Sequence, residues 1–150
     1  MKIMTDKGVL ENALKQAMRS RDDLRKRTLR MVLSAIRLAE IEKGTALEAP
    51  AIPAILQKEI KSRRESIVDA DRARRPELAA EAQAEIAVLE SFLPQQMSAI
   101  EVEELARAAI AEVGAASPRE MGQVMKVLMP KIQGRADGAQ VSQIVRWLLK

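Results

Sequence analysis

Three helix-start signals follow one another in the last third of the chain. Each is a capping box, in which a Ser or Asp side chain accepts a hydrogen bond from an amide three residues later and a Glu or Gln there returns it. The three pairs are Ser98 with Glu101, Ser117 with Glu120, and Asp137 with Gln140. Because each box begins a helix, the signals predict three short helices within residues 97–150, the first of them ending at Gly114.

The earlier part of the chain has the apolar periodicity of longer helices. Apolar side chains recur at three- and four-residue spacing in four segments, and no alternation typical of strands competes with them. The predicted ranges are 7–19, 22–43, 53–72 and 76–93. We therefore predict an all-α protein, with a longer N-terminal helical domain at residues 1–96 and a small three-helix domain at residues 97–150.

The residue types that the chain lacks limit its chemistry. Aromatic residues make up only 1% of the sequence, and there is no His, Cys or Tyr. The usual general base near neutral pH, the thiol nucleophile and the commonest metal ligand are therefore missing. We expect no metal, no cofactor and no catalysis by this chain alone.

The same composition bears on the compartment. There is no cysteine, no early apolar run that resembles a signal peptide, and no apolar stretch long enough to cross a bilayer. These features predict a cytoplasmic protein without a membrane partner.

Charge is unevenly distributed, although the formal net charge is only +4. Residues 19–37 contain seven cations and two aspartates, whereas residues 76–106 contain seven glutamates and no Lys or Arg. This asymmetry indicates either an anionic partner or the packing of one charged helix on another. Glu77, Glu81 and Glu85 stand four residues apart, so their stripe either meets cations of a preceding helix or faces water.

Two segments could bind phosphate through exposed cations. Lys26 and Arg30 lie one turn apart on the second predicted helix, and the alternative is that they are only part of a solvated face. The second segment is MPKIQGRADGAQV, residues 129–141, which holds Lys131 and Arg135 and follows Lys126 by one turn.

Residues 129–141 have two interpretations. Pro130 discourages helix, Gly134 permits a positive φ and Asp137 caps the next helix, which describes a well-made helix–helix turn. The same turn would direct free helix-start amides toward Lys131 and Arg135, and cations beside a helix N-terminus form a small anion site. Trp147 is expected to anchor the small domain rather than to stack on RNA, because single-stranded RNA readers normally offer several aromatics.

The segment SPREMGQVMKVLMPKIQGRADGAQVSQIV resembles the C-terminal motif of the YqeY family. The same module forms the tail of GatB, a subunit of the glutamine-dependent tRNA amidotransferase. Three more segments agree with the family in order along the chain: LRMVLSAIRLAEIEKG, LQKEIKSRRESI and EIAVLESFLPQQMS. The resemblance covers about residues 10 to 149 and departs from the family chiefly in the loop TALEAPAIP.

The resemblance implies an RNA-binding tail without the domains that perform chemistry. In the amidotransferase the tail helps to hold the tRNA while other domains phosphorylate and amidate the misacylated residue. We therefore expect a non-catalytic accessory protein that binds tRNA or another structured RNA and is linked to tRNA aminoacylation or amidation. The expected contacts are Lys126, Lys131 and Arg135, with Lys26 and Arg30 as an auxiliary patch.

Two other functions stay open. The chain could be an adaptor that binds an amidotransferase or aminoacyl-tRNA synthetase subunit. It could also be part of a carbon–nitrogen ligase with glutamine as amido donor, and that reading rests on the family resemblance alone.

Overall fold

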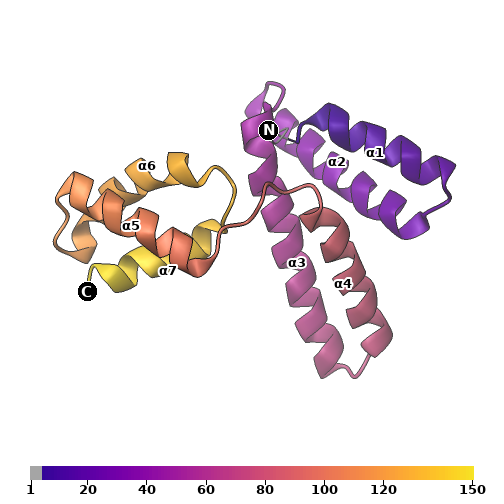
Figure 1. Cartoon of the computed structure of the whole chain (residues 1–150). Helices are drawn as coiled ribbons and strands as arrows, with labels where there is room; N and C mark the ends of the chain where they lie inside the picture. The colour runs from indigo at the N-terminus through magenta and orange to yellow at the C-terminus, as the bar shows by residue number, and fades with distance from the viewer. Residues whose placement is uncertain (1–4) are drawn as a thin grey trace. The chain divides into compact units, whose positions relative to one another are not determined.

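The computed structural model describes residues 5–150, and all of its regular structure within that range is helical (Figure 1). The all-α expectation is confirmed. The α-helices are α1 (Lys7–Arg19), α2 (Asp23–Lys43), α3 (Ile52–Arg72), α4 (Pro76–Glu90), α5 (Ala99–Val113), α6 (Met121–Ile132) and α7 (Gly138–Leu148). Two short 3-10 turns, η1 (Ala49–Ala51) and η2 (Pro118–Glu120), precede α3 and α6.

Side-chain caps determine where several helices begin. The Asp22 carboxylate accepts the Arg25 amide at 3.1 Å at the start of α2, and Ser98 with Glu101 forms the expected box on α5. Ser117 with Glu120 also forms its box, but the box begins η2 and α6 follows from Met121. α2 and α5 end at glycines in the left-handed region, as the sequence predicts.

Two boundaries differ from the sequence prediction. α4 ends at Glu90 rather than continuing to residue 93. α6 continues through Pro130 to Ile132, because a proline in the last turn removes only one helical hydrogen bond. The helix ends at Gln133, whose φ of 49° is left-handed, and Gly134 follows with a φ of 76°.

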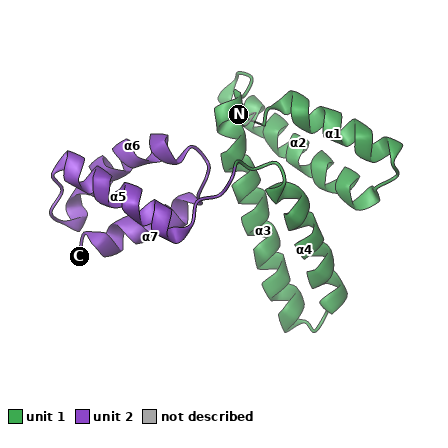
Figure 2. Cartoon of the chain, in the orientation of Figure 1, with its two compact units in different colours: residues 1–94 green, residues 95–150 purple. Residues whose placement is uncertain are grey.

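The chain divides into two compact units, residues 1–94 and 95–150 (Figure 2). In the first unit α1 packs on α2, α3 packs on α4, and α2 contacts both α3 and α4. Its core is mostly aliphatic, also includes Phe92, and draws on all four helices. The most buried large side chains are Leu10, Leu29, Ile36, Ile52, Leu56, Ile60, Ile86 and Leu89.

In the second unit α5, α6 and α7 pack against one another around a separate core. Its buried side chains are Val102, Ala106, Ala109, Val124, Leu128, Ile132, Ala136, Val141, Val145 and Leu149. Whether residues 1–96 and 97–150 fold as independent domains stays a prediction, and fragments can test it.

Candidate nucleic-acid interface

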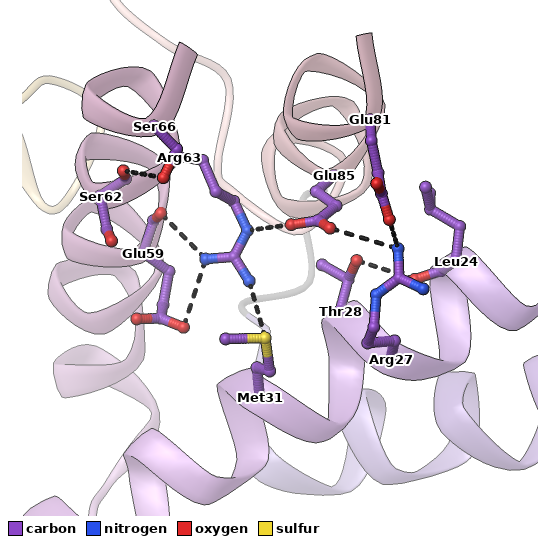
Figure 3. A network of polar contacts seen from close by, with 10 residues as sticks. All are labelled: Leu24, Arg27, Thr28, Met31, Glu59, Ser62, Arg63, Ser66, Glu81 and Glu85. Atoms are coloured by element: carbon purple, nitrogen blue, oxygen red, sulfur yellow. Dashed lines mark hydrogen bonds and ion pairs between the residues drawn. The ribbon is translucent and has the colours of Figure 1, made fainter. Parts of the chain in front are cut away.

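A buried arginine links the two long helices of the α3–α4 hairpin (Figure 3). Arg63 of α3 is 5% exposed, and its Nε donates to Glu85 Oε2 on α4 at 2.8 Å. Its Nη1 also donates to the Glu59 carbonyl at 3.1 Å, and the Glu59 carboxylate forms the i,i+4 pair on the same helix. A charge this deeply buried needs such partners, so Arg63 serves the fold and does not face a ligand.

The glutamate stripe of α4 meets cations from two other helices. Arg27 of α2 donates to both Glu81 and Glu85, on the side of Glu85 opposite Arg63 (Figure 3). Of the two interpretations of the stripe, contact with cations is therefore correct for Glu81 and Glu85. Part of the basic charge of α2 neutralises α4 and is not offered to a partner.

Other cations of α2 remain at the surface, beside an open groove. The groove is lined by Asp23, Lys26, Arg27, Arg30, Met31 and Ser34. Lys26 pairs weakly with Asp23 at 3.4 Å, whereas Arg30 is exposed and has no salt-bridge partner within residues 5–150. The structure thus brings the predicted pair Lys26 and Arg30 to one groove, where both can reach an anion.

The turn at residues 129–141 is more strongly engaged in its own unit than the sequence suggests. Lys131 Nζ lies 3.2 Å from Glu112 Oε2 on α5, and Arg135 Nε donates to the Gln95 carbonyl at 2.8 Å. Lys126 is exposed on α6, five residues before Lys131 and therefore about 140° away around the helix axis. These three cations do not share one helix face.

The expectation of free amides at the start of α7 is also wrong in part. The predicted capping box of Asp137 and Gln140 is not formed, because Asp137 accepts the Ala139 amide at 3.3 Å rather than the Gln140 amide. A carboxylate therefore already occupies this helix start. A phosphate there would meet that negative charge. The turn is first a structural connection. Of the three predicted cations, Lys126 is the one whose side chain has neither an ion pair nor a hydrogen bond within residues 5–150.

Trp147 does not anchor the second unit. Its side chain is 64% exposed, while Val145 of the same helix and Leu149, just beyond the helix end, are buried. The helical period explains the difference, because position 147 lies about 200° around the axis from position 145. The apolar line Val141, Ile144, Val145 and Leu148 was visible in the sequence and already excluded Trp147 from the buried face.

Two carboxyl groups have perturbed pKa values, and both lie outside the groove. A hydrogen bond from Lys7, with a second from the Leu47 amide, holds the pKa of Glu40 below its usual value. A hydrogen bond from Arg75 lowers the pKa of Glu77. Both groups stay ionised near neutral pH, so neither is poised as a general acid or base.

Residues 5–150 contain neither a cluster of metal-ligand side chains nor a membrane-spanning helix. No group of three or more His, Cys, Asp or Glu side chains there is placed to hold a metal ion. None of the helices in this range has the length and apolar composition that crossing a membrane requires.

Comparison with known proteins identifies the family. The Yqey-like protein family matches residues 7–149, nearly the whole chain. The chain belongs to the YqeY-like family. The caps, the residue 129–141 turn and the α2 surface described above all fall inside the matched range.

Three curated relatives share the name "Altered inheritance of mitochondria protein 41, mitochondrial". The protein of Vanderwaltozyma polyspora is 36% identical over 85 residues, which cover 56% of this chain and 46% of the relative. That of Lachancea thermotolerans is 36% identical over 95 residues, covering 63% and 51%. That of Pyrenophora tritici-repentis is 31% identical over 140 residues, covering 91% and 77%. The chain thus spans about half the length of the first two relatives.

These names contradict the predicted cytoplasmic location, because all three relatives are named as mitochondrial proteins. The physical reason for the error is that compositional features such as the lack of cysteine argue against oxidising compartments only. They do not distinguish one reducing compartment from another.

Proposed function

We propose that this YqeY-like protein is a non-catalytic accessory protein that binds tRNA or another structured RNA, with a longer N-terminal helical domain and a small C-terminal three-helix domain. It recognises the phosphate backbone and the shape of the RNA rather than base sequence. The observation that carries the proposal is the α2 groove, where Lys26 and Arg30 lie one helical turn apart. Lys or Arg side chains presented in this way bind phosphate and release counterions.

The C-terminal unit contributes a weaker electrostatic contact in this proposal. Lys126 is exposed and can contact RNA directly. Lys131 contacts RNA only when its ion pair with Glu112 opens, and Arg135 contacts RNA while its Nε still donates to the Gln95 carbonyl. An exposed ion pair such as Lys131–Glu112 is worth little, so RNA can compete for the lysine. The resemblance to the GatB tail supports a link to tRNA aminoacylation or amidation.

A filter-binding assay with total tRNA tests the proposal. If Lys26 and Arg30 each neutralise one phosphate, the affinity falls by about 10-fold between roughly 50 and 200 mM salt. Because the relatives are named as mitochondrial proteins, mitochondrial tRNA is assayed beside bulk tRNA. An affinity for tRNA that does not change with salt would contradict backbone recognition.

An adaptor function is the second candidate, and a specific surface favours it. Met31, Leu38 and Ile41 are 49%, 59% and 70% exposed along α2, at spacings that suit a partner helix. The partner would be an amidotransferase or synthetase subunit. A pull-down with and without nuclease separates the two functions, because an RNA binder loses its cargo to nuclease and an adaptor keeps it. Membership of a carbon–nitrogen ligase that uses glutamine as amido donor is a third candidate and rests only on the resemblance.

A further inference from the structure

The outward face of α7 combines one large aromatic ring with polar and basic side chains. Trp147 is 64% exposed although it is the largest side chain in the sequence. The core of this unit instead uses the smaller residues Val141 and Val145 of α7 and Leu149, which follows the helix. The indole is therefore the largest apolar side chain that this unit presents to a partner.

The neighbours of Trp147 on this face indicate what that partner is. Gln143 lies one turn before it on α7 and is therefore adjacent to the indole on the helix surface, and Lys150 is exposed just beyond the end of the helix. Arg146 directly precedes Trp147, about 100° away around the helix axis, and it is also exposed. α7 itself contains no Asp or Glu, so the face has donors and cations around a flat apolar ring.

We infer that the Trp147 face, formed by Gln143, Arg146 and Trp147 of α7 and by Lys150 beyond the end of the helix, stacks an unpaired RNA base while Arg146 or Lys150 contacts its phosphate. Every base offers a π-face to an indole, and the charge of this surface complements a polyanion. This inference rests on the proposed RNA-binding function and adds to it. It assigns the C-terminal unit to a single-stranded or looped nucleotide, whereas the α2 groove contacts the backbone alone.

The sequence makes the experiment clean, because Trp147 is the only tryptophan and there is no tyrosine. The protein is titrated with fluorescein-labelled oligouridylate, and RNA anisotropy is measured beside indole emission in matched unlabelled samples. We expect oligouridylate to quench Trp147 emission and a blunt RNA duplex to leave it nearly unchanged. Trp147→Ala should lower the oligouridylate affinity by about 5- to 150-fold, the effect of one stacked base.

Two variants serve as controls. Trp147→Phe should keep most of the affinity, because phenylalanine also presents a π-face. Ile100→Ala removes another apolar side chain of the same unit, 69% exposed on α5, and should bind as the wild type does. Thermal melts of all variants should agree closely, which separates binding from folding.

The outcomes distinguish this inference from the proposed function. If oligouridylate binds by anisotropy while emission and the Trp147→Ala affinity do not change, base stacking is wrong and RNA binding stands. If neither oligouridylate nor tRNA binds at low salt, the proposed function fails and this inference fails with it. Equal quenching by polyglutamate would show that the face binds acidic polymers, and base stacking would again be wrong.

Discussion

Arg63 and Glu85 join α3 to α4 through a hydrogen bond of 2.8 Å between Nε and Oε2. The Arg63 side chain is 6% exposed and the Glu85 side chain 15%, so both charges lie largely out of water. Arg27 binds the other oxygen of Glu85 and thereby connects α2 to the same pair (Figure 3). An ion network therefore joins α2, α3 and α4 within the first unit.

Removing the arginine should destabilise the protein strongly. Arg63→Ala leaves Glu85 with only its more exposed partner, and we expect a loss of about 3 kcal/mol, the lower end of the range for breaking a buried pair. Urea unfolding followed by circular dichroism measures it. The double variant Arg63→Met/Glu85→Leu should recover much of the loss because no unpaired charge remains. A single variant as stable as the wild type would show that the network contributes nothing to folding.

The sequence predicted those parts of this fold that depend on local physics. Asp22, Ser98 and Gly44 act within one turn of their own helices, so caps and ends could be assigned without knowledge of packing. The contacts of Arg63 could not be assigned in this way, because its main partner, Glu85, is 22 residues away and only the α3–α4 hairpin brings the two together. From sequence alone the i,i+4 pair with Glu59 was the visible interaction.

The candidate site shows the same division. Lys26 and Arg30 were predicted together because their spacing on one helix is local information. The engagement of Lys131 by Glu112 and of Arg135 by Gln95 depends on how α5 and the preceding segment pack, and no periodicity indicates it. The position of Trp147 does not depend on such packing, because the apolar period of α7 alone indicates that its side chain lies outside the core of the second unit.

Trp147→Ala should have little effect on stability. An exposed side chain leaves no cavity when truncated, so we expect a change within about 0.5 kcal/mol. Leu128→Ala, at a fully buried position of the same unit, is the matched control and should cost about 2–5 kcal/mol. The folded protein should also emit at wavelengths typical of a hydrated indole. Blue-shifted emission together with a large loss of stability in Trp147→Ala would show that Trp147 is buried in the core.

Acid should weaken the contact between the start of α1 and the end of α2. Lys7 Nζ lies 2.9 Å from Glu40 Oε1 and the Leu47 amide 3.0 Å from Oε2, which lowers the Glu40 pKa from its usual 4.5. Because the folded pKa is the lower one, the stabilisation is complete above about pH 4.5 and disappears as pH falls through the folded value.

The variant Glu40→Gln tests this by melting temperature as a function of pH. It should melt below the wild type at neutral pH, and the difference should shrink as the solution becomes more acidic than pH 4.5. Glu42→Gln, an exposed neighbour on α2, should follow the wild-type profile. A Glu40→Gln deficit of constant size at every pH would mean that the carboxylate charge is not involved.

The second unit should fold as a fragment if it begins early enough. Met97 donates its amide to the Arg135 carbonyl at 2.7 Å, and Gln95 and Gln96 bond to Arg135 and Gly134. Residues 95–150 should therefore unfold cooperatively, whereas 98–150 should be less stable by about 2 kcal/mol because three hydrogen bonds and the packing of Met97 are lost. Thermal unfolding of the two purified fragments measures the difference. A 95–150 fragment without helical structure would show that the domain prediction is wrong.

Salt dependence should rank the predicted RNA contacts. Each phosphate neutralised by a cation contributes a slope of about −0.7 to −0.9 to log K against log salt. Lys26→Gln/Arg30→Gln should flatten the slope by about two contacts, because both side chains line the α2 groove. Lys131→Gln/Arg135→Gln should flatten it by less than two, because Glu112 and the Gln95 carbonyl already engage these cations in the free protein. Lys58→Gln/Lys61→Gln removes the same charge from exposed positions on α3 outside that groove and should keep the wild-type slope.

tRNA binding is measured across a salt series for all three double variants, with thermal melts to verify folding. If the α2 variant keeps the wild-type slope while the Lys131/Arg135 variant loses two contacts, the turn at residues 129–141 is the principal interface and the assignment to α2 is wrong. If all three keep the wild-type slope, the cations chosen here do not contact RNA, and the adaptor function leads.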